Sequence, residues 1–317
     1  MIEISSDLIE KLTKINDILK ERSTISSLEV DKIRHSLSIS GAVFRQMEPL
    51  GSEMIARWLD NKQIGAVDGS VNQTKGSPPH VLYLFQALAK TLQGVETKKT
   101  DVYSPLLDSP EDETEPLKWR AHILSKLELK AALDLMDQAE LAILMMDGAL
   151  YHYRIDAPEE WEVLRNRALE RGTLLVGVSE EITTRNIGSL SPFTTMFKHQ
   201  TVYDRDLLFG VLHKRESLYI ESIQQKAGLR SVWMRASSSP AITGFDMLEE
   251  QAEEMNDVAD FLATMTPEDG RGIPLFLDIV DREVRLSDKL VEAMVDQYLE
   301  TELKERYFSQ KREERPY

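Results

Sequence analysis

Two short apolar runs that each end in Asp-Gly constrain the fold of this chain most strongly. The first, IGAVDGS, covers residues 64–70 and contains Asp68, and the second, LAILMMDGAL, covers residues 141–150 and contains Asp147. A segment without Gly or Pro, residues 117–139, lies between them and predicts a long helix. Because parallel strands need a helical crossover, this pattern predicts two core strands of a mixed α/β sheet.

The remaining segments complete a prediction of the fold. Apolar runs predict further strands near residues 80–89, 94–103, 173–179, 218–223 and 229–236. Helical periodicity predicts helices over residues 5–35, 41–60, 158–171, 201–216, 246–264 and 274–308. We therefore expect a ribonuclease-H-like mixed sheet flanked by helices, with helical additions at the N-terminus and the C-terminus. Residues 1–58 form a helical region for packing or dimerisation, and residues 59–317 form the main domain.

The absence of Cys and of several motifs excludes whole classes of site. The chain has 317 residues and no Cys, so disulfides, thiolate zinc sites, iron–sulfur clusters and cysteine nucleophiles do not occur. The motifs GxGxxG, GxxxxGK(S/T) and GxSxG are also missing. An NAD-binding fold, a P-loop ATPase and a serine hydrolase are therefore disfavoured.

Charge and hydropathy bear on location and partners. The N-terminal residues carry acids where a signal peptide has a basic segment, and the longest apolar runs are too short to cross a bilayer. We expect a cytoplasmic protein with no membrane contact. The net charge of 38 − 54 = −16 argues against binding nucleic acid by bulk charge. Carboxylates that bind metal ions can nevertheless bring a phosphate to a site.

The two Asp residues and one helical Glu are the candidate site. An Asp-Gly pair is an ordinary turn signal, but two such pairs on core strands of one sheet favour a functional site. Glu128 has apolar neighbours on its own face of the predicted helix, at Leu124, Ala131, Ala132 and Leu135. A buried carboxylate needs a cation or hydrogen bonds. Pairing with Lys126 or Lys130 is the alternative, and it is weaker because both lie two residues away on other faces.

Oxygen ligands without Cys are typical of Mg²⁺ or Mn²⁺ sites. Two such ions about 3.5–4 Å apart can bind the attacking and leaving oxygens during phosphodiester hydrolysis. This chemistry needs no side-chain nucleophile, and none is evident. The residue pattern therefore predicts a metal site formed by Asp68, Glu128 and Asp147.

The order of these motifs resembles that of the NurA family of nucleases. AVDGS, an acid within a long helix, LMMDGAL, LLVGVS, TVYDRDLLFGVL and IPLFLDIVD follow one another over about residues 60–290. The resemblance implies a ribonuclease-H-like fold and makes residues 59–317 a NurA-like nuclease domain. It implies manganese-dependent endonuclease and 5′–3′ exonuclease activity on DNA. It also implies a homodimer that docks on the hexameric ATPase HerA, in DNA-end processing, repair or phage defence.

Carried over residue by residue, the resemblance makes Asp68, Glu128 and Asp147 catalytic, metal-binding residues. Two positions depart from the family. Asp281 stands where the family usually has a His, so we take it as a candidate fourth ligand with different proton-transfer behaviour near neutral pH. Glu180 stands where many members have Lys, which removes a phosphate contact. We assign no residue to the family's conserved Tyr.

Several alternatives remain open. A weakly active or inactive NurA-like subunit that mainly binds the ATPase is the second hypothesis, motivated by Glu180 and Asp281. An enzyme acting on RNA is the third, although no residue reports contacts to a 2′-hydroxyl. Asp281 also has an ordinary explanation as a surface ion pair with Arg285. A locally basic stretch either contacts DNA or forms a plain solvated surface, and it comprises Lys198, Arg205, Lys214 and Arg215.

Overall fold

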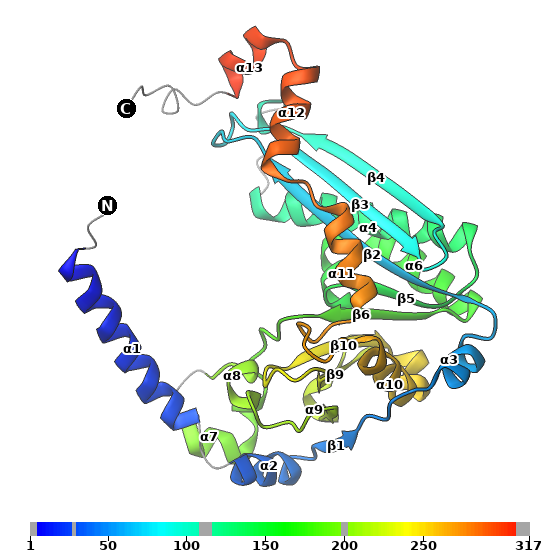
Figure 1. The fold of residues 1–317 in the computed structure, drawn as a ribbon. Coiled ribbons are helices and arrows are strands. Elements are labelled where there is room, and N and C mark those ends of the chain that lie inside the picture. The colour runs from blue at the N-terminus through cyan, green and yellow to red at the C-terminus, as the bar shows by residue number, and fades with distance from the viewer. Residues whose placement is uncertain (1–4, 27–29, 108–115, 198–201, 309–317) are drawn as a thin grey trace.

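A computed structural model describes residues 5–26, 30–107, 116–197 and 202–308. In this part of the chain, one sheet has the strand order β1-β7-β9-β10-β6-β5-β2-β3-β4, with β8 paired to β9 (Figure 1). The strands are β1 (Val43–Gln46), β2 (Gln63–Gln73), β3 (Tyr83–Thr91), β4 (Glu96–Tyr103), β5 (Leu141–Asp147), β6 (Leu174–Ser179), β7 (Glu216–Tyr219), β8 (Gln225–Lys226), β9 (Leu229–Arg235) and β10 (Thr243–Leu248).

One half of the sheet has the ribonuclease-H-like arrangement β4-β3-β2-β5-β6. The strands β2, β3 and β4 pair in antiparallel fashion, whereas β5 runs parallel to β2 and β6 runs parallel to β5. The helix α4 (Pro116–Gln138) leads from β4 into β5, and α6 (Pro158–Arg171) leads into β6. Helical crossovers therefore connect the parallel strands, and the predicted fold class is confirmed.

The other half extends the same sheet with antiparallel strands. β10 pairs with β6 on one side and with β9 on the other, and β9 pairs with β7. The predicted helix over residues 246–264 is therefore wrong at its start, because β10 continues to Leu248 and the helix α10 spans Met255–Met265. All six residues of β10 are buried in the interior of the sheet, so their apolar spacing does not reveal which element they form.

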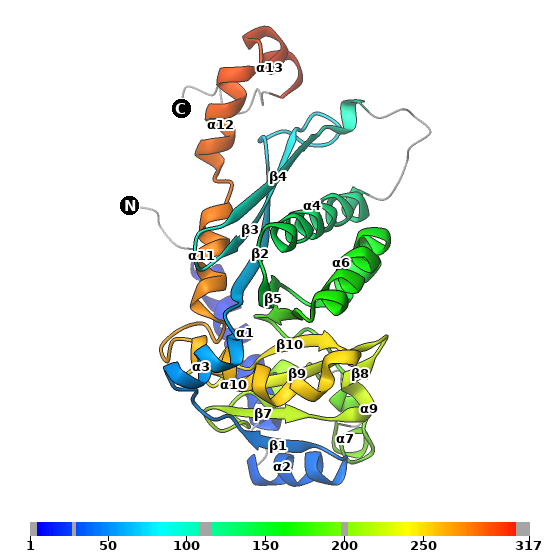
Figure 2. The same ribbon diagram turned by 90° about the vertical axis from the view of Figure 1, so that its right-hand side faces the viewer.

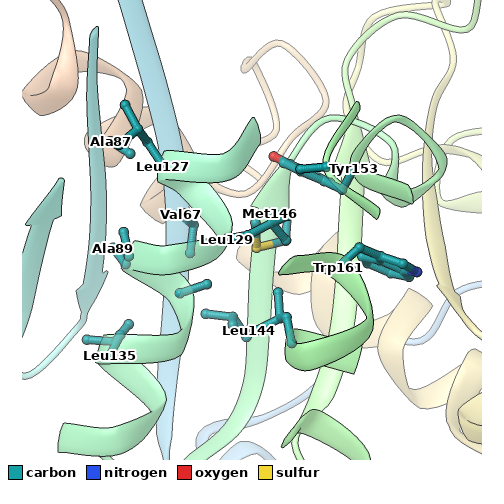
Figure 3. Close-up of a cluster of buried hydrophobic side chains, with 14 of the residues drawn as sticks. Val67, Ala87, Ala89, Leu127, Leu129, Leu135, Leu144, Met146, Tyr153 and Trp161 are labelled. Carbon is teal, nitrogen blue, oxygen red and sulfur yellow. The ribbon is translucent and has the colours of Figure 1, made fainter. Parts of the chain in front are cut away.

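Helices cover both faces of the sheet (Figure 2). On one face, α4 and α6 pack with α5 (Leu150–Asp156) over a core that Figure 3 shows around Val67, Leu144 and Trp161. On the other face, α10 and α11 (Leu275–Val284) cover Ala66, Met145 and Phe245. The central strands thus separate two apolar cores, and successive residues along them face one core and then the other.

The N-terminal region contains a strand that the sequence pattern did not predict. The helices α1 (Ser6–Ser26) and α2 (Val30–Ile39) come first, and the segment after Gly41 is β1, which pairs with β7. The predicted helix over residues 41–60 is therefore wrong in its first half, and only α3 (Ser52–Leu59) is helical. Gly41 has φ +88°, a left-handed backbone that ends α2 before the strand.

The middle segment also departs from its prediction, whereas the C-terminal segment does not. Of the described residues 202–216, only α8 (Asp204–Leu208) is helical, because Gly210 and Arg215 adopt positive φ values of 75° and 59°. Residues 274–308 are largely helical as expected, in α11, α12 (Asp288–Tyr298) and α13 (Thr301–Tyr307). Short helices lie at α7 (Ser191–Phe197) and α9 (Glu221–Gln224). None of the described helices has the length and apolar character to cross a membrane.

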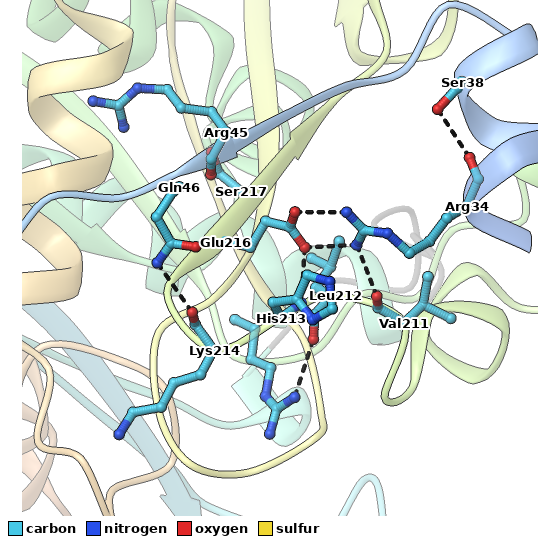
Figure 4. A network of polar contacts seen from close by, with 11 residues as sticks. Arg34, Ser38, Arg45, Gln46, Val211, Leu212, His213, Lys214, Glu216 and Ser217 are labelled. Carbon is cyan, nitrogen blue, oxygen red and sulfur yellow. Dashed lines mark hydrogen bonds and ion pairs between the residues drawn. The ribbon is translucent and has the colours of Figure 1, made fainter. Parts of the chain in front are cut away.

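A charged pair attaches α2 to the extended half of the sheet (Figure 4). Arg34 donates two hydrogen bonds of 2.7 Å to the Glu216 carboxylate and a third of 3.0 Å to the Val211 carbonyl. Glu216 is buried, and the His213 N–H is its other donor at 2.8 Å. Burial raises the pKa of Glu216, but the hydrogen bonds from Arg34 and from the His213 N–H and the charge of Arg34 together outweigh this effect and leave the pKa below its usual value.

We expect Arg34→Met to reduce the free energy of unfolding by about 2–3 kcal/mol, because Glu216 would stay buried without its main counter-charge. Urea denaturation measures this loss. Lys11→Met is the control, since Lys11 pairs with Asp7 on the exposed surface of α1 and its removal leaves stability nearly unchanged. Equal stability of the two variants would contradict this account.

Candidate active site

Asp68 and Asp147 lie side by side on neighbouring strands. Val67 pairs with Met146 in the parallel register of β2 and β5, so the next residue on each strand is the Asp. Asp147 is the last residue of β5, as predicted. Asp68 is not at a strand end, because β2 continues to Gln73 through its pairing with β3. The Asp-Gly pair in β2 is thus no turn, and Asp68 is buried in the middle of the strand.

Strand alternation gives the two Asp residues a common face. Ala66 and Met145 belong to the core beneath α11, whereas Val67 and Met146 belong to the core beneath α4. Asp68 follows Ala66 by two residues, and Asp147 follows Met145 by two residues. Because every second side chain of a strand lies on the same face, both Asp residues face the α11 side of the sheet.

Asp281 on α11 lies close enough to Asp68 and Asp147 for its charge to affect their pKa values. Its negative charge raises the pKa of both Asp68 and Asp147. The structure therefore brings the candidate fourth residue to the same site.

Glu128 reaches the site from the opposite face, and Gly69 makes room for it. A Cβ atom on Gly69 would lie 2.1 Å from the Glu128 Oε1 atom and 2.8 Å from the Leu124 Cδ1 atom. Any side chain at residue 69 would therefore displace the Glu128 carboxyl group. Glu128 is only 6% exposed, and Lys126 pairs with Glu160 at 3.1 Å. The ion-pair alternative through Lys126 does not apply.

Burial and mutual repulsion keep these carboxyl groups protonated to an unusually high pH. Burial raises the pKa of Glu128 from its ordinary value of 4.5 to about 8, although a hydrogen bond with Tyr153 opposes the shift. Burial is also the main cause that raises the pKa of Asp68, with the charge of Asp147 second. The pKa of Asp147 is raised by burial and by the charges of Asp281 and Glu180. The three acids thus strongly favour a source of positive charge.

Arg271 is the cation nearest to this group, and it joins Glu180 to α11. It pairs with Glu180 at 2.9 Å, with Asp278, and with Asp281 at 3.9 Å. Its charge lowers the pKa of Asp147. Glu180 and Asp281, the two departures from the family pattern, therefore share one cation, which also pairs with Asp278. Asp281 pairs with Arg271 and not with Arg285 in the described structure.

Hydrogen bonds fix the chain just after Asp147. The Gly148 N–H donates to the Val178 carbonyl at 2.8 Å, and the Tyr153 hydroxyl donates to the Asp147 carbonyl at 3.0 Å. Asp246 on β10 is buried and accepts backbone N–H bonds from Leu150 and Tyr151. The carboxylate of Asp147 is therefore held on a rigid turn between β5 and α5.

Sequence reasoning missed Tyr153 and Arg271. Tyr153 is buried, and burial, followed by the charge of Glu128, raises its pKa well above the usual value. Its spacing from Leu150 and Ala157 on one helical stripe was an available signal of burial. Arg271 lies in the loop TPEDGRG, where composition indicates only a turn. Its role depends on the packing of α11 against β2, which no local pattern reports.

The predicted basic stretch does not form a free basic surface. Lys198 lies outside the described residues. Arg205 pairs with Glu181 at 3.1 Å, and Lys214 pairs with Glu268. Arg215 donates to the Ala263 carbonyl at 3.1 Å. The basic side chains of the stretch that the structure describes are thus engaged with carboxylates or a backbone carbonyl of this chain.

The donor set suits a hard divalent cation, since it consists of carboxylates whose ionised forms repel one another. Glu128, placed in the space left by Gly69, has no cation of its own among the described ion pairs. No three His, Cys, Asp or Glu side chains within the described ranges already surround one point as ligands do. The acids approach from both faces of the sheet, so ion binding requires some of these carboxyl groups to rotate.

The topology and this carboxylate centre define a ribonuclease-H-like protein with an acidic site on its central strands. The sequence model of the NurA domain matches residues 62–286, more than two thirds of the chain. The chain belongs to the NurA family. The family resemblance that the motifs indicated is thereby confirmed.

Solved structures of similar fold include a nuclease of this family. The NurA nuclease from Sulfolobus solfataricus matches with a TM-score of 0.58 and 15% identity, over 94% of this chain and 99% of that chain. Endonuclease V from Ciona intestinalis matches with a TM-score of 0.41 and 15% identity, over 89% and 99% of the two chains. The catalytic domain of human Endonuclease V matches with a TM-score of 0.40 and 13% identity, over 83% and 95%.

No curated protein sequence matches this chain. The family assignment and the likeness to a NurA nuclease together support a nuclease.

The raised carboxyl pKa values predict how the stability of the metal-free protein depends on pH. Glu128 binds its proton more tightly in the folded state than in the unfolded state, so stability is highest near pH 5 and falls as the pH rises to about 8. We expect the unfolding temperature in EDTA to decrease by about 5 °C or more over this range.

Thermal unfolding of Glu128→Gln provides the control, because this variant lacks the titrating group. Its decrease over the same range should be clearly smaller than that of the unaltered chain. Parallel curves for both proteins would show that Glu128 does not cause the effect.

Proposed function

We propose that this protein is a Mn²⁺- or Mg²⁺-dependent nuclease that hydrolyses phosphodiester bonds of DNA, as an endonuclease and a 5′–3′ exonuclease. One observation carries the proposal: Asp68 and Asp147 occupy neighbouring positions of two central strands, and Glu128 of α4 fills the space left by Gly69, in a chain of the NurA family. Buried acids without a counter-charge cost folding free energy, and groups with such perturbed pKa values cluster at functional sites.

In this proposal Asp68, Asp147 and Glu128 hold the metal, and Asp281 is a fourth ligand. A bound divalent cation supplies positive charge that offsets the charge of the scissile phosphate and polarises water. Ion binding requires the three central carboxyl groups to lose their protons, which their raised pKa values oppose. Arg271 already pairs weakly with Asp281, at 3.9 Å, and more closely with Glu180, at 2.9 Å. Glu180 can therefore retain Arg271 when Asp281 turns toward an ion.

A groove beside Asp68 supports DNA as the substrate. It lies between the end of β2 and the start of α12 and is lined by Ser70, Asn72, Arg285, Ser287, Asp288 and Lys289 among others. Leu286 N–H donates to the Ser70 hydroxyl at 3.0 Å, which fixes the two walls together. Arg285 and Lys289 are exposed there. Two cations only a few residues from the carboxylate centre can contact the phosphates on either side of the scissile bond.

A second candidate function has a specific observation in its favour. In the described chain no three acids already converge as ligands, and Arg271 lies 3.9 Å from Asp281. A subunit with little activity that mainly binds a HerA-like ATPase would show the same arrangement. The retention of Glu128 in the space left by Gly69 favours the active enzyme, and cleavage assays separate the two.

We expect Asp68→Asn and Asp147→Asn each to reduce Mn²⁺-dependent cleavage of plasmid and linear DNA by at least a hundredfold. Each change keeps the shape of the side chain and removes a charge that the metal needs. Because it also removes repulsion between buried acids, thermal stability in EDTA should be unchanged or higher.

Gel assays with Mn²⁺, Mg²⁺ and EDTA measure cleavage, and Asp101→Asn on the exposed end of β4 is the matched control. Near-normal cleavage by either site variant would refute the assignment. No cleavage by the unaltered chain with any divalent ion would favour the binding subunit.

We also propose that the protein acts in the cytoplasm as a homodimer that docks on a HerA-like hexameric ATPase, in DNA-end processing, repair or phage defence. The N-terminal region, residues 1–58, would serve assembly. The apolar stripe of α1 supports this role, since it is about half exposed along its length at Leu8, Ile9, Leu12, Ile15 and Leu19.

Light scattering at micromolar concentration tests the dimer. We expect a dimer for the unaltered chain and a monomer for Leu12→Asp/Ile15→Asp. A monomeric unaltered protein would contradict the proposed homodimer. Cleavage that does not increase when a HerA-like ring hydrolyses ATP would remove the proposed partnership.

A further inference from the structure

Tyr153 of α5 connects two parts of the carboxylate centre that come from different elements. Its hydroxyl donates to the Asp147 carbonyl at 3.0 Å and also hydrogen-bonds with the Glu128 carboxyl group. Asp147 ends β5, whereas Glu128 comes from α4. One buried hydroxyl therefore joins the helix that carries one acid to the strand that carries another. The nuclease proposal gives this hydroxyl no role.

The start of α5 is held against two strands, and this fixes the place of Tyr153. The buried carboxyl group of Asp246 on β10 accepts backbone N–H bonds from the first turn of α5. Gly177 of β6 allows a close approach, because a Cβ atom there would lie 2.6 Å from the Gly148 carbonyl oxygen and 2.7 Å from the Leu150 nitrogen. The first turn of α5 therefore rests on both β6 and β10.

The end of α5 is attached to α4 by a contact that does not involve the Tyr153 hydroxyl. The Nδ1 atom of His122 on α4 lies 2.6 Å from the Asp156 carbonyl oxygen. A carbonyl oxygen only accepts hydrogen bonds, so the imidazole N–H is the donor. Loss of the Tyr153 hydroxyl would therefore leave α5 attached to α4 and to the sheet.

The Tyr153 ring is buried in the core beneath α4 (Figure 3). Leu127 and Leu129, which flank Glu128 in the sequence, belong to the same core. Tyr153 is 3% exposed and Glu128 is 6% exposed, so water has little access to either polar group. Such groups need partners inside the protein, and the hydroxyl and the carboxyl group are partners of each other.

This contact restricts a side chain that otherwise has many conformations. A Glu side chain loses much rotamer freedom when it is ordered, and a ligand that binds it must supply this free energy unless the side chain is already fixed. Gly69 leaves the space for the Glu128 carboxyl group, and the Tyr153 hydroxyl holds the group there. A carboxylate only accepts hydrogen bonds and a hydroxyl proton can rotate, so Tyr153 can also donate to an ionised Glu128.

We propose that Tyr153 is a positioning residue, which holds the Glu128 carboxyl group in place relative to Asp147 and thereby increases the affinity of the centre for a divalent cation. The effect on the cation rests on the proposed nuclease function. Groups that hydrogen-bond to metal ligands typically change metal affinity by about 10–100-fold. A tyrosine that only fills the core would change the stability of the fold and not the affinity for the ion.

Mn²⁺ titration followed by electron paramagnetic resonance measures binding without DNA and without cleavage. The proteins are the unaltered chain, Tyr153→Phe, Glu128→Met and the double variant. Met has a length similar to that of Glu and lacks the carboxyl oxygens. We expect Tyr153→Phe to raise the Kd for Mn²⁺ by about tenfold. In the Glu128→Met background the same change should have no further effect, because the partner of the hydroxyl is missing.

Tyr83→Phe is the matched control, since it also removes one hydroxyl from a tyrosine of this core. Tyr83 is 5% exposed and pairs with Gln73 at the end of β2. Its removal should leave the Kd for Mn²⁺ unchanged.

Urea unfolding of the same four proteins in EDTA tests the contact without metal. Tyr153→Phe should lower the free energy of unfolding more in the chain that contains Glu128 than in the Glu128→Met background.

The outcomes separate this proposal from the nuclease proposal. An unchanged Kd in Tyr153→Phe, or an equal rise in both backgrounds, would overturn the positioning role, and Mn²⁺-dependent cleavage by the unaltered chain would leave the nuclease function standing. If the unaltered chain binds no Mn²⁺, the metal-dependent function fails, while non-additive unfolding free energies would still support the role of Tyr153 at Glu128. Additive unfolding free energies would overturn that role as well.

Discussion

The repulsion among two buried acids, Asp68 and Glu128, and the partly buried Asp147 is the constraint on which the centre of this structure depends. Asp68 and Asp147 occupy neighbouring positions of a parallel strand pair, and Glu128 enters from the other face. Removal of these groups from water raises the pKa of each, and their mutual charges add to the effect. Gly69 leaves the space that Glu128 fills, while Arg271 supplies a counter-charge at the periphery. The surrounding turns and helices keep the acids together against this repulsion.

The sequence predicts the structure correctly where a residue type and its immediate neighbours determine the secondary structure and the burial of a side chain. The long helix before β5 lacks Gly and Pro, and an acid on its apolar face reports burial directly. Asp147 ends a strand because Gly148 follows it with φ +100°, a conformation that favours Gly. Asp68 lies beside Asp147 although it is not at a strand end, and the Gly that follows it makes room for Glu128 instead of forming a turn. The candidate site could thus be found even though its local geometry was misread.

The sequence does not predict the structure where hydrogen bonding between distant segments determines whether a segment is a strand or a helix. β1 and β10 have spacings that also fit helices, and they are strands because β7 in one case and β6 and β9 in the other accept their hydrogen bonds. The same holds for Arg271, since the loop that carries it gains its place beside the acids only through contacts with β10 and α11. Tertiary packing overrides local propensity at each of these positions.

The continuity of the sheet has a mechanical consequence. β6 pairs with β5 on one side and with β10 on the other, so the strands that carry Asp68 and Asp147 and the antiparallel strands beyond β6 belong to one hydrogen-bonded sheet. Movement of β10 relative to Asp147 would therefore have to break backbone hydrogen bonds of β6.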